Sequence, residues 1–387
     1  MLLKGFEVEA YTGTPDGDIV GLSDRITANL DNFVREPDSR NVEYITPPRE
    51  SYERLLCDLV TPRLQLRRYL KTLGNYTIIP GSTLSLGDSK TFYRSDPTHP
   101  YHDYIEHTYG TRVVTASIHI NVGISDPEDL IRACRLLRVE APLYLALSAS
   151  SPFLDGQPTG YHSTRWGTFP QTPEQVPLFT SHIDHIRWVE RQLALGTMQN
   201  VRHLWTSVRP NGDRRPYDLN RLELRICDLV TDSVSLLAIT ALLEARLHQL
   251  LANPELDPLQ QSELPGSSRA DDLLEMTSAN EMAVAKYSLD ATLRHWRDGR
   301  EILAKDWIQE IYGEVMPIAK QNGFRCFLSP LQELLAKGNT AQQWLRLYDK
   351  GLTPRQILQG AIIDIVQQEQ ELSGNFVRRV RSPRNAD

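Results

Sequence analysis

The sequence predicts an α+β fold, in which a mostly antiparallel sheet is backed by helices and is followed by a largely helical C-terminal half. Short alternating stretches mix with helical segments only in residues 1–230, whereas residues 231–372 show almost continuous helical periodicity. The strand-like stretches are separated by long helices and hairpin-like returns. Neither Gly-x-Gly-x-x-Gly nor a Walker-type Gly-Lys-Ser/Thr occurs, which disfavours Rossmann and P-loop folds.

Six stretches in the N-terminal part alternate in hydrophobicity or are rich in β-branched and aromatic residues, and most lie near turn-forming residues. We expect strands at Lys4–Tyr11, Val42–Thr46, Tyr76–Pro80, Ser117–Val122, His203–Val208 and Arg221–Cys227. Between them, apolar residues at helical spacing predict helices over Tyr52–Leu73 and Pro127–Leu147. Pro62 marks a start or a kink in the first helix, and Asp126 is a suitable N-cap for the second.

The C-terminal part begins with Thr231 or Asp232, which we expect to cap a helix running to about Leu251. Residues 254–270 are polar and predict a loop. Further helices are expected around Asp271–His295, Glu301–Tyr312, Pro330–Ala336, Thr340–Tyr348 and Pro354–Leu372. We expect residues 1–375 to form a single unit, with a sheet-bearing part (1–230) and a helical part (231–375), and residues 376–387 to form a basic, flexible tail.

Composition narrows the class of protein. The 387 residues carry 42 basic and 49 acidic side chains, a formal charge of −7, which argues against nucleic acid as a partner. Charges at Lys4, Glu7 and Glu9 exclude an apolar signal segment, and no apolar run approaches the roughly 20 residues that span a bilayer, so we expect no membrane association. The four cysteines are far apart in the sequence, so we expect them to be reduced thiols. A cytoplasmic location is therefore the expectation.

Four of the predicted strands contain charged or polar side chains among their apolar residues. In three of these strands, two such side chains lie on the same face. The paired positions are Glu7 with Glu9, His119 with Asn121 and Glu223 with Arg225, while Glu43 stands alone among apolar neighbours. One interpretation is that each strand is amphipathic and simply exposes its polar side chains to solvent. If the faces converge, however, the carboxylates and one imidazole form a site that suits Mg²⁺ and tolerates Mn²⁺.

Two loop regions carry further polar candidates. Arg165, set among small and aromatic residues, is either an anion clamp for a carboxylate or phosphate or a surface arginine. The serine-rich segment Ser148–Phe153 lies nearby in sequence. The stretch Gly81–Tyr104 is long, polar and short of core residues, which favours a substrate loop.

These segments, in this order, resemble the carboxylate–amine ligases of the glutamate–cysteine ligase superfamily, and are most similar to its cyanobacterial-type subgroup. The resemblance covers roughly residues 1–300. It is carried by the following segments: Gly5–Glu9, Val42–Pro48, Pro80–Thr83, Ser117–Gly123, Ser148–Phe153 with Ser163–Arg165, Leu222–Asp228 and Lys286–Ala291.

The resemblance implies a glutamine-synthetase-like curved sheet whose concave face holds ATP and divalent metal. It implies an ATP-dependent ligase that joins the γ-carboxylate of L-glutamate to the amine of L-cysteine through a γ-glutamyl phosphate, the first step of glutathione biosynthesis. It assigns residues as follows: Glu7, Glu9, Glu43, His119 and Glu223 as metal ligands, Arg225 and Arg165 as catalytic and nucleotide-binding residues, and Asn121 and Ser150 as further nucleotide-binding residues. One more acidic ligand is expected before Glu43, and both Glu36 and Asp38 are candidates.

Two rival hypotheses remain at this stage. The same scaffold could join glutamate to a different amine acceptor, or residues 231–387 could bind a protein partner while the sheet is inert. The carboxylate cluster also predicts mutational behaviour. Glu9→Gln or Glu223→Gln should abolish turnover without unfolding the protein, and should even stabilise it as like-charge repulsion falls.

Overall fold

The structure is a computed structural model that describes residues 1–265 and 268–381, with side chains described to residue 373. Its centre is a seven-stranded sheet in which every pairing is antiparallel. The order is β2-β3-β1-β5-β9-β8, and β4 pairs with the far end of β1. The strands are β1 (Lys4–Gly13), β2 (Phe33–Arg35), β3 (Asn41–Ile45), β4 (Thr77–Ile79), β5 (Ile118–Gly123), β8 (Val208–Asn211) and β9 (Arg221–Leu224).

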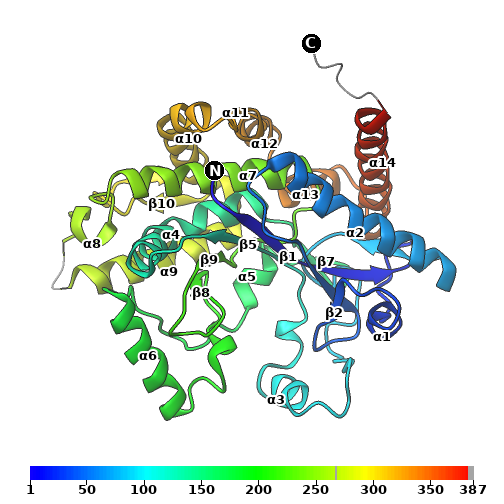
Figure 1. The fold of residues 1–387 in the computed structure, drawn as a ribbon. Coiled ribbons are helices and arrows are strands. Elements are labelled where there is room, and N and C mark those ends of the chain that lie inside the picture. Colours follow the sequence, from blue (N-terminus) through cyan, green and yellow to red (C-terminus); the bar gives the residue numbers. More distant parts are fainter. Residues whose placement is uncertain (266–267, 382–387) are drawn as a thin grey trace.

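The alternation within β1 decides which way the sheet faces. Phe6, Val8 and Ala10 are buried on the side covered by helices, so Glu7 and Glu9 point to the opposite side. The long helices of the covered side are α2 (Tyr52–Leu73), α4 (Pro127–Ser148) and α7 (Ser233–Ala252). In Figure 1, α7 lies on one side of β1 and the small helix α3 (Pro100–Tyr109) lies on the other.

The helical part packs onto the same covered side. Its helices are α8 (Pro258–Gln261), α9 (Arg269–Tyr287), α10 (Ala304–Gln321), α11 (Arg325–Leu328), α12 (Leu331–Lys337), α13 (Thr340–Asp349) and α14 (Pro354–Arg381). One buried hydrophobic cluster runs from Phe6 to Ile362 and so includes both parts. Helix α7 is long and apolar enough to cross a membrane by length and composition alone, but 72% of that window is buried inside the fold.

The smaller elements complete the chain. They are α1 (Ser23–Thr27), α5 (Thr164–Thr168), α6 (His182–Leu195), the 3₁₀ turns η1 (Gly110–Val113), η2 (Val201–His203) and η3 (Ser288–Asp290), and the hairpins β6 (Phe153–Leu154) with β7 (Gln157–Pro158) and β10 (Thr292–Arg294) with β11 (Glu301–Leu303).

The predicted fold class is confirmed, and most predicted elements occur near their expected bounds. Asp232, not Thr231, caps α7, and Pro62 lies inside α2. The prediction of a strand at His203–Val208 is wrong in position, because His203 ends a 3₁₀ turn and the strand begins only at Val208. The predicted helix over Asp271–His295 ends early, because Ser288 adopts a positive φ of 46° and the chain turns into β10.

The C-terminal end of the chain differs from expectation in part. The predicted helix Glu301–Tyr312 begins with strand β11 and becomes helical only at Ala304. Helix α14 continues to Arg381, beyond the predicted end at Leu372. Residues 382–387, and the side chains from 374 onward, lie outside the described residues, so the flexible basic tail stays a prediction.

Candidate active site

Glu7, His119 and Glu223 meet at the middle of the uncovered sheet face. Glu7 and His119 are directly opposite in the β1–β5 ladder, and Nδ1 of His119 lies 3.0 Å from Oε2 of Glu7. The same nitrogen lies 3.6 Å from Oε1 of Glu223, which projects from β9. One ligand atom from each of the three residues lies within 4.8 Å of the others. This geometry is compatible with a divalent cation held by two oxygens and one nitrogen.

Glu223 is enclosed by basic and polar side chains. Nε and Nη2 of Arg209 donate to its two carboxylate oxygens at 2.7 and 3.0 Å, and Nδ2 of Asn211 donates at 2.6 Å. Arg225 donates to Oε1 from the other side. Burial alone would raise the pKa of Glu223, but Arg209, Arg225 and His119 outweigh it and hold that pKa well below its usual range. Glu223 is therefore ionised and already neutralised by the protein.

A second group of carboxylates lies toward the β2–β3 edge. Glu9 is directly opposite Glu43 in the β1–β3 ladder, and Ser117 donates its hydroxyl to Glu9 at 2.8 Å. Glu36 follows β2, and its carboxyl group is hydrogen-bonded to Glu43. Burial, followed by the neighbouring carboxylates, raises the pKa of Glu36 well above its usual range and that of Glu43 to about 8. Raised pKa values favour the protonated forms of these two groups when no cation is bound.

The geometry distinguishes the two candidates for the additional acidic ligand. Asp38 is 2% exposed, and its oxygens accept hydrogen bonds from Nε and Nη2 of Arg40 and from the backbone N–H of Tyr93. Its carboxylate is thus engaged in a buried ion pair. Glu36, by contrast, contacts Glu43 and lies within electrostatic reach of Glu9 and Glu7. Glu36 is the residue that joins the acidic face.

The donor chemistry of this face fits a hard divalent cation. Four glutamates from three strands or their ends lie close together: Glu7, Glu9 and Glu43 all help to raise the pKa of Glu36, and Glu7 and Glu9 help to raise that of Glu43. Within the described residues, neither Glu36 nor Glu43 has a basic side chain among its main electrostatic partners. A cation such as Mg²⁺, which prefers carboxylate oxygens, would relieve this repulsion. The predicted convergence of Glu7, Glu9, Glu43, His119 and Glu223 is observed, and their role as ligands stays a prediction.

Arg165 lies in α5 and is buried, not on the surface. Nη1 and Nη2 donate to the backbone carbonyls of Ile226 and Arg225 at 3.0 and 3.1 Å, and Nη1 lies 3.8 Å from Asp228. Its Nε is buried and has no hydrogen-bond partner in the described part of the chain. Arg165 therefore fixes the backbone that carries Arg225 and retains one donor for an anion.

The two remaining predicted residues occupy different environments. Asn121 donates from Nδ2 to Glu7 at 3.2 Å, and its buried Oδ1 has no partner among the described residues. Ser150 is 1% exposed, its N–H donates to Asp228, and its hydroxyl donates to the carbonyl of Leu229. Asn121 belongs to the acidic face, whereas both polar groups of Ser150 are engaged inside the fold. The assignment of Ser150 to nucleotide binding stays a prediction.

The sequence reasoning missed Arg209 and Asn211, which hold Glu223. Both lie on β8, and the misplaced strand at His203–Val208 ended one residue before the first of them. The alternation of Arg209 with Pro210 and Asn211, facing a strand that carries Glu223, is the signal that could have found them.

A cavity of about 750 Å³ opens beside Glu7 at the start of β1. Strand ends with small or apolar residues line this cavity together with polar side chains. The lining includes Leu3, Gly5, Ile45, Gly123, Asn121 and Arg221. Leu3 and Ile45 are 48% and 58% exposed, which is unusual for apolar residues on a sheet. The cavity offers an apolar surface next to the carboxylates.

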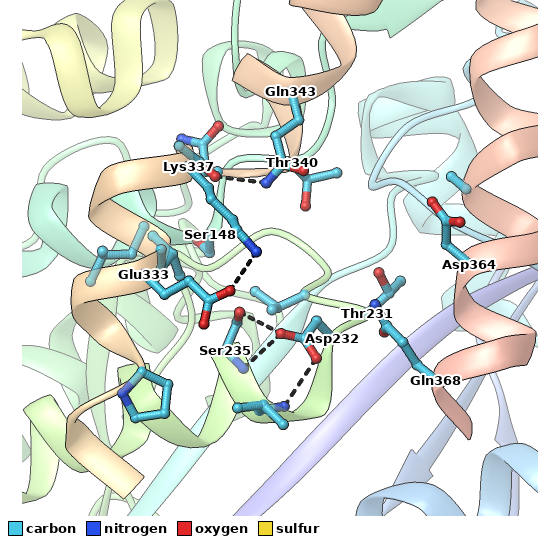
Figure 2. Close-up of a pocket in the computed structure, with 18 of the residues that line it drawn as sticks. Ser148, Thr231, Asp232, Ser235, Glu333, Lys337, Thr340, Gln343, Asp364 and Gln368 are labelled. Carbon is cyan, nitrogen blue, oxygen red and sulfur yellow. Dashed lines mark hydrogen bonds and ion pairs between the residues drawn. The ribbon is translucent and has the colours of Figure 1, made fainter. Parts of the chain in front are cut away.

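A second cavity of about 390 Å³ lies among α7, α12, α13 and α14 (Figure 2). Its polar groups largely satisfy one another. Asp232 accepts from the N–H groups of Val234 and Ser235, and Lys337 pairs with Glu333. None of the nine predicted site residues, all of which are described, lines it. The candidate active site is therefore the uncovered face of the sheet.

Comparisons with known proteins show that this chain is similar to ligases. A family model described as glutamate-cysteine ligase family 2 matches residues 3–368. A relative from Rubrobacter xylanophilus, provisionally named glutamate–cysteine ligase 2-1, is 28% identical over 89% of this chain and 88% of its own length. A relative from Sorangium cellulosum, provisionally named glutamate–cysteine ligase 2, is 29% identical over 60% of this chain and 58% of its own length.

Two solved structures share the fold. The glutamate–cysteine ligase of Francisella tularensis, determined in complex with AMP, superimposes with a TM-score of 0.71 at 13% identity and covers 100% of this chain and 95% of that one. A bifunctional glutathione synthetase from Pasteurella multocida has a TM-score of 0.71 at 14% identity, covering 96% of this chain and 52% of that one. The antiparallel sheet, the acidic face and the family match over 3–368 together show that this chain belongs to glutamate-cysteine ligase family 2.

Proposed function

We propose that this protein is an ATP- and Mg²⁺-dependent ligase that joins the γ-carboxylate of L-glutamate to the amine of L-cysteine. The observation that carries the proposal is the convergence of carboxylates from β1, β3 and β9 with His119 and two arginines on one sheet face. Such a surface suits phosphoryl transfer, which needs neutralised oxygens and an aligned nucleophile more than covalent help from the protein.

The chemistry would proceed in two steps on this face. The γ-carboxylate of glutamate attacks the γ-phosphorus of ATP, which gives an acyl phosphate and ADP. The amine of the acceptor then attacks the acyl carbon and displaces phosphate. Arg225, which contacts Glu223 and His119, would stabilise charge on the phosphoryl oxygens, and the unpartnered Nε of Arg165 would bind a carboxylate or phosphate.

The site also has room and ligands for the nucleotide complex. Glu36, Glu43, Glu9 and Glu7 would hold Mg²⁺, which when bound would neutralise the phosphate oxygens of ATP. The apolar cavity beside Glu7 would accept the flat base, because its lining residues Leu3, Gly5 and Ile45 present little polar surface. The family match and the AMP-bound structure from Francisella tularensis support nucleotide use.

A second candidate keeps the reaction and changes the acceptor amine. It is favoured by the low identity to the relatives, 28–29%, which leaves the acceptor subsite free to differ. Glutamate would still be activated on the same face. The two candidates differ only in which amine accelerates phosphate release.

The experiment is a phosphate-release assay on the full chain with ATP, Mg²⁺ and glutamate, with a panel of amines added one at a time. We expect release to rise at least tenfold with an amine and to be highest with L-cysteine. A higher rate with another amine supports the second candidate. No amine-dependent release under any condition contradicts both.

A pair of matched variants separates the site from the general charge of the protein. Glu9→Gln should abolish release, because it removes a carboxylate from the acidic face. Glu333→Gln, on the surface beside the second cavity, removes the same charge from a side chain that is 65% exposed and should leave the rate unchanged. Equal losses in both variants would show that the acidic face has no special part in turnover.

A further inference from the structure

Arginines gather around Glu223 in excess of carboxylates. Arg209 and Arg225 contact Glu223 directly, and Arg202 and Arg215 lie within electrostatic reach of it or of each other. Burial, followed by Arg225, lowers the pKa of Arg209 to about 10, despite its bonds to Glu223. The side chains of Arg202 and Arg215, unlike those of Arg209 and Arg225, form no ion pair with a carboxylate among the described residues.

Arg215 differs from the arginines that contact Glu223 because, within the part of the chain that the structure describes, its side chain makes no hydrogen bond or ion pair. It lies in the turn that joins β8 to β9, is half-buried, and forms no hydrogen bond or ion pair with any described side chain. Its Nη1 is buried without a hydrogen-bond partner in the described part of the chain. An unpaired guanidinium beside three others is costly, because burial and like charge both disfavour it.

The neighbouring residue supplies a comparison within the same turn. Arg214 is 78% exposed and pairs with Asp218, as is usual for a surface arginine. Arg215 is instead half-buried and lies within electrostatic reach of Glu223, Arg202, Arg221 and Arg225. Arg221 pairs with Asp213 and lines the apolar cavity beside Glu7.

We propose that Arg215 and Arg202 form an oxyanion subsite at the β8–β9 edge of the acidic face, completed by a phosphate of the nucleotide or by the carboxylate of the acceptor amino acid. A guanidinium fork matches both anions, since each presents paired oxygens. The inference rests on the proposed function for the identity of its two anion sources. Its charge argument does not depend on turnover.

The test compares Arg215→Gln and Arg215→Lys with the control Arg214→Gln. In steady-state assays we expect Arg215→Gln to raise one KM at least tenfold with kcat within threefold, Arg215→Lys to recover part of the loss, and Arg214→Gln to resemble the wild type. A nucleotide subsite raises the KM of ATP and weakens binding of Mg·ADP measured by calorimetry. An acceptor subsite raises the KM of the amino acid only, and cysteamine, which lacks the carboxylate, is used equally by variant and wild type.

The outcomes also separate this inference from the proposed function. Binding of Mg·ADP and of inorganic phosphate needs no turnover, so a loss of either in Arg215→Gln supports the subsite even if no amine accelerates phosphate release. The proposal is overturned if every KM and both binding constants of Arg215→Gln stay within twofold of those of Arg214→Gln. Unfolding of Arg215→Gln would also overturn it, because a side chain without partners should not be required for folding.

Discussion

The two ends of the acidic face contain the same kind of side chain in opposite electrostatic states. At the β9 end, Glu223 is fully buried, bound by Arg209 and Arg225, and has a pKa well below its usual range. At the β2–β3 end, Glu36 and Glu43 face each other, and burial with neighbouring carboxylates raises both pKa values. The protein supplies fixed cationic side chains at one end, whereas Glu36 and Glu43 at the other end have no basic side chain among their main electrostatic partners in the described residues.

This difference shows that carboxylates within one cluster can respond in opposite ways to the loss of their charge. Removing charge from the β9 end leaves guanidiniums without a partner, whereas removing charge from the β2–β3 end relieves repulsion. The expectation from sequence that Glu223→Gln would leave the fold intact or stabilised does not fit the contacts that Glu223 makes. The same expectation does fit the opposite end.

The largest effect is expected for Glu223→Gln. Because Arg209 and Arg225 would remain buried without a carboxylate, the variant should lose about 3–5 kcal/mol of unfolding free energy together with its activity. Urea unfolding followed by circular dichroism, in the absence of Mg²⁺, measures the loss. A variant as stable as the wild type would show that the two ends do not differ as described.

The next largest effect concerns Mg²⁺. At a concentration 100 times its dissociation constant, Mg²⁺ should stabilise the wild type by about 2.7 kcal/mol. Glu36→Gln should lose most of this gain, because it replaces a carboxylate that would hold Mg²⁺ with a neutral amide. Asp38→Asn should destabilise the protein through Arg40 and yet keep its response to Mg²⁺. Thermal unfolding with and without Mg²⁺ distinguishes them, and the reverse pattern would assign Asp38 to the site.

The pH dependence of stability should have opposite signs at the two ends. Glu43 has a folded pKa of about 8, so in metal-free protein its favourable protonated state is lost as pH rises through 8. Glu43→Gln should therefore gain stability relative to the wild type by about 2 kcal/mol from pH 6 to pH 8. Glu223, with its depressed pKa, contributes stability that disappears only as pH falls into the acid range. Parallel pH curves for wild type and Glu43→Gln would refute the assignment.

The smallest effect is expected where α3 contacts His203. Tyr109 of α3 contacts Nε2 of His203 through its hydroxyl at 3.0 Å, and Tyr109→Phe should cost about 1 kcal/mol of stability. The response to Mg²⁺ should be unchanged, because neither end of the acidic face loses a charge. An altered response to Mg²⁺ would show that the contact between α3 and His203 contributes to the difference between the two ends of the acidic face.

Much of the fold and part of the site follow from local patterns in the sequence. Period-two alternation places Glu7 and Glu9 on one face, and capping residues such as Asp126 and Asp232 locate the long helices. The choice between Glu36 and Asp38 could not be made, because both lie in one short segment and only the contact with Arg40 separates them.

Other features depend on contacts between distant segments. The contact of Arg209 with Glu223 depends on the pairing of β8 with β9, since the two residues are fourteen positions apart in the sequence. Whether Arg215 has a hydrogen-bond partner depends on all the segments that surround it in the fold. A local sequence pattern therefore does not predict it. The cytoplasmic location and the L-cysteine acceptor stay predictions.

Arg209 has a further consequence, because its guanidinium reaches in two directions. While Nε and Nη2 hold Glu223, Nη1 donates to the backbone carbonyls of Arg202 and Leu204 at 2.9 and 3.0 Å. Those carbonyls flank His203, whose ring meets Tyr109 of α3. One side chain thereby connects Glu223 on the acidic face with α3. Three non-covalent contacts and the backbone next to His203 complete this path, so a displacement of Glu223 would be transmitted to α3.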